Sequence, residues 1–183
     1  MGITQFISKI KVKRSIIKCQ KELSKELANG ITYDFLYKIF SHISNLFDLE
    51  KSNNTFMLYD DYFNGIQIVV TVLPNNGIDK FGFMFEELEH ISAFKYTRRN
   101  IGVYVVNDNR IFVSEEIIRY DVSDRRKEEY TYLFDKSINI SGIRHKDFIT
   151  PTVSTNVQLL EFNLDRYFKH LIDWIKEKSM VRL

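Results

Sequence analysis

The stretch NIGVYVVNDNRIFVSEEIIRY, residues 100–120, decides the fold of this chain. Two runs rich in Val, Ile, Tyr and Phe flank the segment Asn107-Asp108-Asn109. Branched and aromatic side chains suit the pleated surface of a β-sheet. Asn and Asp tolerate the left-handed backbone that a tight hairpin turn requires. The pattern therefore predicts an antiparallel hairpin over residues 101–118.

Further strands are predicted on both sides of this hairpin. Upstream, residues 56–59 and 66–73 flank a polar loop. The second of these segments, IQIVVTVL, is apolar on both faces, so we expect a central strand that ends at Pro74. Downstream, the pattern predicts a charged loop at 121–129, a strand at 130–140 and irregular chain at 142–150.

The segment that follows residue 80 contains two competing patterns. Phenylalanines occupy every second position from Phe81 to Phe85, as in a strand, whereas Met84, Leu88 and Ile91 fall at helical spacing. We predict a strand as far as Phe85 and a helix after it.

Helices are predicted at both ends of the chain. The first covers residues 12–27, with a capping turn at Asn29-Gly30, and the second starts after an N-cap at Thr32 and is deeply buried. The last covers about residues 156–178. The first helix has one apolar face, made by Val12, Ile16, Cys19, Leu23 and Leu27.

These elements predict an α+β fold: an antiparallel β-sheet of about five to seven strands, with two N-terminal helices and one long C-terminal helix packed on it. We expect a single domain over residues 1–183. Its parts are an N-terminal helical pair at 1–50, a β-rich core at 54–150 and a C-terminal helix at 155–178.

Composition limits the function classes. The chain has 183 residues, of which 44% are hydrophobic and 27% charged, so it has enough apolar residues for a substantial core. A single cysteine excludes an internal disulfide, and we find neither a membrane-length apolar stretch nor a secretory signal. We therefore expect a cytoplasmic protein that does not act on membranes. The net charge of +2 is too small to indicate a partner.

The strongest candidate binding surface is a row of cations on the first predicted helix, opposite its apolar face. No acidic residue precedes Glu22. Aligned cations attract phosphate backbones or acidic protein surfaces, although a solvated helix face shows the same pattern. The row consists of Lys11, Arg14, Lys18, Lys21 and Lys25.

Arg98 and Arg99, which follow Tyr96, are a second candidate, because basic residues among aromatics can contact single-stranded nucleic acid. The basic residues at 125–127 are largely cancelled by acidic neighbours, which favours an ordinary charged loop.

A divalent-metal nuclease or phosphodiesterase is the catalytic alternative, with Asp60, Asp61 and Glu87 as candidate catalytic residues. Such enzymes need two or three carboxylates that converge on Mg²⁺. The sequence does not show whether these three converge, and acidic turns are common in any domain.

Other catalytic signatures are not found. The seven glycines are scattered, so there is no phosphate-binding loop, no serine has a nucleophile elbow, and we expect no cofactor or metal. Cys19 has no neighbouring His in the sequence, so we do not expect a thiolate nucleophile.

The segment from Arg166 to His170 resembles the Arg-to-His motif of HEPN ribonucleases. It is one residue shorter than that motif, and both ends fall on the expected solvent face.

The preferred hypothesis is therefore a non-catalytic binding protein, an inhibitor or regulator of the kind carried by phages and mobile elements. Its partner would be a protein or a nucleoprotein complex, and nucleic acid itself is possible. A structural subunit that forms a homodimer is a further alternative.

Overall fold

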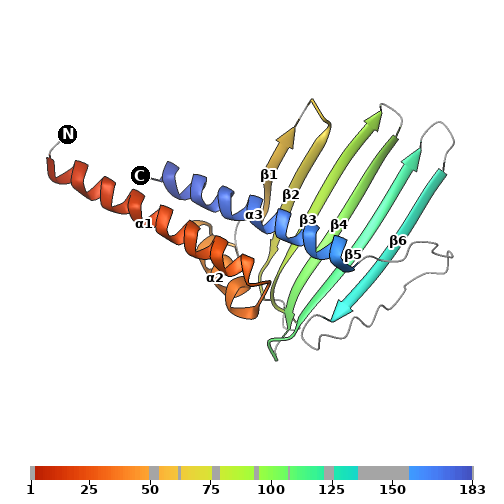
Figure 1. Cartoon of the computed structure of the whole chain (residues 1–183), viewed down its shortest axis with the longest axis horizontal. Coiled ribbons are helices and arrows are strands. Elements are labelled where there is room, and N and C mark those ends of the chain that lie inside the picture. The colour runs from red at the N-terminus through yellow and green to blue at the C-terminus, as the bar shows by residue number, and fades with distance from the viewer. Residues whose placement is uncertain are drawn as a thin grey trace. The chain divides into compact units, whose positions relative to one another are not determined.

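The computed structural model confirms the α+β class, with an antiparallel sheet, two N-terminal helices and one C-terminal helix (Figure 1). It describes residues 3–49, 54–61, 63–75, 79–92, 95–106, 108–121, 126–135 and 157–182. In these residues the elements are α1 (Ile3–Ala28), α2 (Tyr33–Leu46), β1 (Thr55–Asp61), β2 (Ile66–Leu73), β3 (Asp79–Ser92), β4 (Lys95–Val106), β5 (Ile111–Asp121), β6 (Arg126–Asp135) and α3 (Val157–Val181).

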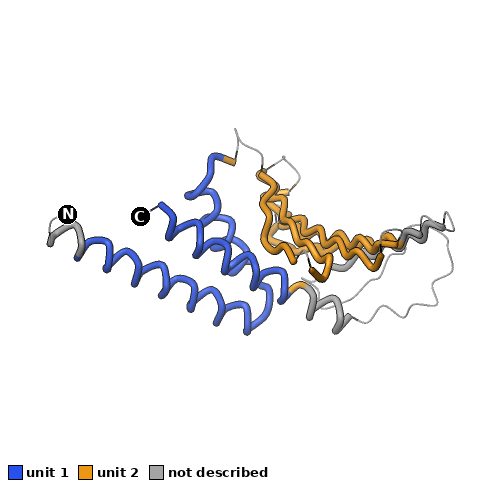
Figure 2. Tube along the Cα trace, turned by 90° about the horizontal axis from the view of Figure 1, so that it is seen from above, with its two compact units in different colours: residues 1–48, 165–183 blue, residues 49–164 orange. Residues whose placement is uncertain are grey.

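The chain divides into two compact units (Figure 2). The helical unit comprises residues 1–48 and 165–183, and the sheet unit comprises residues 49–164. The helical unit is therefore assembled from the two ends of the chain. The expectation of a single domain over residues 1–183 stays a prediction.

The sheet is a meander in which each strand pairs antiparallel with its neighbour in sequence, in the order β1-β2-β3-β4-β5-β6. The predicted hairpin is confirmed as β4 and β5, which pair from Lys95↔Asp121 to Val105↔Ile111. Asn109 in the turn has a φ of 65°, the left-handed conformation for which Asn is suited.

One face of the sheet is buried and the other is partly exposed. Along β2, Ile68, Val70 and Val72 are buried, whereas the residues between them are half-buried. The alternation continues through β3 and β4, so apolar side chains from adjacent strands form continuous rows. β2 pairs on both sides, as expected of an inner strand, but only one of its faces is buried.

Two sequence predictions in this unit are wrong. The helix predicted after Phe85 does not form, because β3 continues to Ser92 and pairs with β4 along its length. The loop predicted at 121–129 is also wrong at its ends, since β6 starts at Arg126 and pairs with the end of β5. Residues 136–140 of the predicted strand, and the segment 142–150, lie outside the described residues.

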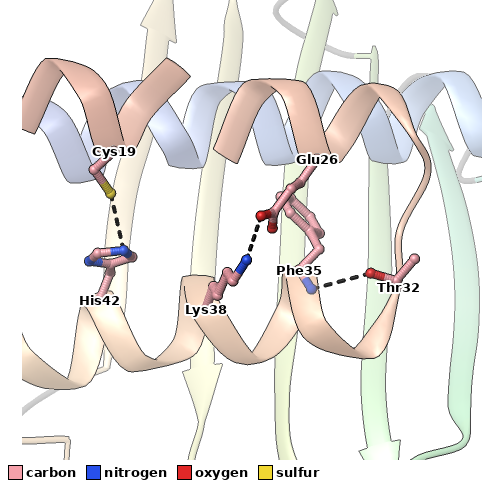
Figure 3. Close-up of polar contacts among 6 residues, drawn as sticks. All are labelled: Cys19, Glu26, Thr32, Phe35, Lys38 and His42. Carbon is pink, nitrogen blue, oxygen red and sulfur yellow. Dashed lines mark hydrogen bonds and ion pairs between the residues drawn. The ribbon is translucent and has the colours of Figure 1, made fainter. Parts of the chain in front are cut away.

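The helical unit begins with two well-capped helices. Gly30 has a φ of 99° and donates its N–H to the Leu27 carbonyl at 2.9 Å, which ends α1 as predicted. The Thr32 hydroxyl accepts the Phe35 N–H at 3.2 Å, which confirms the predicted N-cap of α2 (Figure 3).

Aromatic contacts connect α2 to the C-terminal part of α3. The Phe35 and Phe168 rings meet edge to face with centroids 5.3 Å apart, and Phe47 stacks on Trp174 at 5.4 Å. Gln20 of α1 donates to the Asp173 carboxylate at 2.6 Å, so all three helices contact one another in this unit.

Candidate interaction surface and buried polar clusters

The five cations Lys11, Arg14, Lys18, Lys21 and Lys25, which we call the basic face of α1, are all exposed. Their spacing of three and four residues places them on one side of the helix, along about 21 Å at 1.5 Å per residue. Lys18 lies 3.8 Å from Glu22 in an exposed pair. None of the other four takes part in an ion pair with a described residue. The basic face of α1 is therefore exposed to solvent.

The opposite side of α1 is only partly covered. Leu23 and Leu27 are buried, with 3% and 8% of their surface exposed, but Val12 retains 40%. Ile16 and Cys19 are half-buried. The predicted apolar face therefore packs in the C-terminal half of the helix, while the N-terminal half remains largely in solvent.

Cys19 has a histidine neighbour, contrary to the sequence prediction. Its Sγ lies 3.1 Å from Nε2 of His42 on α2, as Figure 3 shows. The two residues are on separate helices, so their proximity arises only from packing. Both line a cavity of about 150 Å³, together with side chains that include Gln20, Leu23 and Lys176.

The electrostatics of this pair do not favour a nucleophile. Burial, reinforced by Glu22 and Glu26, raises the pKa of the Cys19 thiol. Burial lowers the pKa of His42. Both shifts favour the neutral thiol and the neutral imidazole over the thiolate–imidazolium pair that a cysteine nucleophile uses.

Arg98 and Arg99, the second predicted binding pair, belong to the sheet unit and lie on opposite faces of β4. Arg98 is paired with Glu86 at 2.6 Å on the partly exposed face. Arg99 Nη1 lies 3.5 Å from Glu87, and its Nε lies 3.2 Å from Glu115. Both guanidinium groups are thus already engaged by carboxylates of the same unit.

Arg99, Glu87 and Glu115 form a buried cluster across β3, β4 and β5. Glu87 and Glu115 are 8% and 5% exposed. Burial raises the pKa of Glu115, and Arg99 partly opposes this. The Arg99 Nε is close to Glu115 but is not hydrogen-bonded, so the single guanidinium compensates the two carboxylates incompletely.

Sequence reasoning did not single out Glu115. The signal was present in the alternation of β5, because Ile111 and Val113 are buried and Glu115 follows in the same row. A carboxylate in a buried row needs a countercharge, and Arg99 supplies it.

The three candidate catalytic carboxylates are not brought together. Asp61 accepts the Asn64 side-chain amide at 2.7 Å and the Asn64 N–H at 3.1 Å, which lower the pKa of its carboxyl. Asp60 accepts from Gln67 at 3.3 Å. Glu87 is on β3, separated from β1 by β2, a distance of about 10 Å between strands. Among the described residues, no three His, Cys, Asp or Glu are grouped to hold a metal ion.

The two ends of the HEPN-like segment are both half-buried rather than fully solvent-exposed. The Arg166 guanidinium lies over the Tyr167 ring, 5.1 Å from its centroid. This contact occupies one face of the group that the ribonuclease motif would use.

Comparison with known proteins gives no relative, since the chain matches no protein-family model, no curated protein and no solved structure. Within the described residues, no helix combines the length and apolar content required to cross a bilayer.

Proposed function

We propose that this protein is a non-catalytic binding protein, an inhibitor or regulator, that engages an acidic macromolecular partner through the basic face of α1. The observation that carries the proposal is the exposure of all five cations along one side of the helix. Only Lys18 has a described carboxylate partner, and that pair is 3.8 Å apart and largely exposed. Such a weak, screened pair would be replaced readily by a partner's carboxylates or phosphates.

Arg98 and Arg99 are not part of this proposal. Their ion pairs with Glu86, Glu87 and Glu115 would have to be broken before either guanidinium could bind a partner. The basic face of α1 has no comparable cost.

The test is charge reversal of Lys11, Arg14, Lys18 and Lys21 to Glu in one variant. Probes are a 20-base-pair DNA duplex, a single-stranded RNA of 20 nucleotides and poly-glutamate, each titrated at several salt concentrations. For the duplex we expect a loss of affinity of more than tenfold. The slope of log K against log salt should fall by about 3 to 4, because each phosphate contact contributes about 0.9.

A matched control reverses four exposed cations that lie outside α1. It should retain wild-type binding, and melting temperatures verify that both variants are folded. If the α1 variant binds every probe as the wild type does, the basic face is not a binding surface and the proposal is wrong. The control positions are Lys95, Arg110, Arg119 and Lys169.

A further inference from the structure

The partly exposed face of the sheet is richer in apolar residues than an antiparallel sheet requires. Directly opposed residues in the strand register share a face, so this face can be followed across β1 to β5. A solvated sheet face normally carries polar residues that alternate with the buried ones. Here eight apolar residues occupy it, all of them exposed or half-buried: Met57, Val69, Leu73, Met84, Leu88, Tyr104, Phe112 and Ile118.

Two methionines are the most exposed of these residues. Met57 of β1 and Met84 of β3 retain 47% and 37% of their surface. Val69 of β2 pairs with Met57 and lies diagonally across from Met84, so the three side chains form a continuous patch. A contiguous apolar patch of this kind is more than a scattered surface hydrophobe and marks an interaction site.

Two glycines keep the partly exposed face level. Gly82 and Gly102 lie on neighbouring strands, opposite Tyr104 and Met84 respectively. A β-carbon at Gly102 would overlap the Tyr104 ring, and a β-carbon at Gly82 would lie 3.1 Å from the same ring. The Tyr104 side chain therefore lies against the sheet across both glycines. A level face suits contact with another sheet, because packed sheets are only about 10 Å apart.

The charged groups of this face are matched within the chain. Arg98 lies 2.6 Å from Glu86. The Asn100 amide donates to the Glu116 carboxylate at 2.7 Å. The charges of these groups nearly cancel, so the patch selects neither a strongly acidic nor a strongly basic partner. A surface of its own kind, apolar and nearly neutral, fits it.

The partly exposed face is large enough for a dimer interface. Five strands about 4.8 Å apart and four rows of side chains about 6.8 Å apart span roughly 24 by 27 Å, or about 650 Å² in projection. Protruding side chains make the accessible area larger than this projection, so it approaches the roughly 800 Å² per partner of a standard interface.

We propose that the partly exposed face of β1 to β5 binds the same face of a second copy, in a two-fold dimer of packed sheets. The apolar residues of the two copies would cover one another, while the polar pairs within each copy stay intact. This inference does not depend on the proposed function, because it uses only residues of the sheet unit.

The test measures the molar mass of the full-length protein by light scattering between about 1 and 100 μM. The key variant is Met57→Glu/Met84→Glu. The matched control is Ile91→Glu/Val181→Glu, which makes the same change of charge at aliphatic residues exposed elsewhere. Because all four side chains are exposed, both variants should fold, which melting temperatures would verify.

We expect the wild type to be a dimer at the upper concentrations. The Met57/Met84 variant should lose about a hundredfold or more in dimer affinity, because a two-fold interface brings both added carboxylates of each copy into an apolar contact. The control variant should dimerise like the wild type.

Methionine oxidation by dilute hydrogen peroxide gives a second readout that needs no mutation. A dimer covers Met57 and Met84, so both should oxidise several-fold more slowly at the highest protein concentration than at the lowest. Met180, which is half-buried in the helical unit, is the internal control and should oxidise at the same rate throughout.

Three results would overturn this inference. The first is a wild type that is monomeric at every concentration, whose sheet face would then serve a different partner. The second is a Met57/Met84 variant that dimerises as the wild type does, since the interface would then lie elsewhere. The third is slow oxidation of Met57 and Met84 in a monomer, because another part of the chain would then cover the face.

Discussion

Replacing Arg99 by Met is expected to destabilise the protein by about 3 kcal/mol near pH 7. The change removes the only described cation beside Glu115 and one cation beside Glu87, while it keeps a long side chain in the row. Breaking a buried ion pair typically costs about 3 to 5 kcal/mol, because the remaining charge is left in an apolar environment. The lower end applies here, since the Arg99 side chain is 23% exposed and water reaches part of the cluster.

Arg98, the next residue on the same strand, is the matched control. Its side chain and that of Glu86 are 45% and 40% exposed, so Arg98→Met should cost less than about 1 kcal/mol. The two variants make the same chemical change on opposite faces of β4. The difference between them measures burial rather than strand propensity.

The loss of stability caused by Arg99→Met should depend on pH. The pKa of Glu115 is already raised by burial, and removing Arg99 also removes the effect that opposes this. A carboxyl whose pKa is raised in the folded state contributes its full stability below its pKa in the unfolded chain, about 4.5. That stability is lost as the pH rises through the pKa of the folded state. The Arg99→Met variant should therefore approach wild-type stability at acidic pH and diverge from it near neutrality.

Urea unfolding followed by far-ultraviolet circular dichroism, at several pH values between 4.5 and 8, measures these free energies. Adding Glu115→Gln to Arg99→Met should recover part of the loss at pH 7, because it removes the stranded charge. The reasoning is refuted if Arg99→Met costs no more than Arg98→Met, or if its loss is the same at every pH.

Three further predictions concern stability, and the first two use the same urea unfolding at several pH values. Glu115→Gln alone should flatten the decline in stability above about pH 4.5, because the neutral amide does not titrate; an unchanged pH profile would contradict the raised pKa of this carboxyl. Burial lowers the pKa of His42 below 6.5, so the contribution of this residue to stability is present above pH 6.5 and is lost as the pH falls through its pKa in the folded state. His42→Gln should remove this loss of stability at acidic pH. A variant that keeps the loss would contradict the lowered pKa of His42. Gly30→Ala should cost about 1 kcal/mol, because the φ of 99° disfavours a β-carbon even though nothing lies within 4 Å of it; Gly30→Asn should cost less, and equal melting temperatures for all three proteins would show that this turn is not strained.

The elements that could be predicted from the sequence were those fixed by local chemistry. The hairpin of β4 and β5, the glycine that ends α1 and the threonine that starts α2 each depend on residues close together in the chain. Local signals of this kind require no knowledge of the remaining fold.

β3 was mispredicted because positions four apart are ambiguous. Met84 and Leu88 share a face of a helix, but they also share a face of a strand, since four is an even number of residues. Ile91 is an odd number of residues from Met84, so in a strand it falls on the opposite face. The alternating burial of Phe81, Phe83 and Phe85 decides in favour of the strand.

Contacts between distant segments could not be predicted. His42 reaches Cys19 only because α1 and α2 pack side by side. Arg99 contacts Glu115 only because the register of β4 and β5 places the two residues on neighbouring strands within ion-pair distance. The basic face of α1 was visible as a pattern. The exposure of the aliphatic residues in the N-terminal half of α1 could not be predicted, because it depends on where the neighbouring helices end.

The helical unit is interrupted by the entire sheet unit, residues 49–164, and this has a consequence for biosynthesis. During translation, α1 and α2 leave the ribosome well before the part of α3 that carries Phe168 and Trp174. Until that part is synthesised, Phe35 and Phe47 cannot form their contacts with these two aromatic rings. Closing an unstructured insertion of roughly a hundred residues costs about 4 kcal/mol in chain entropy, and a folded sheet reduces that cost. A mutation that unfolds the sheet unit should accordingly weaken the packing of α1 and α2 against α3.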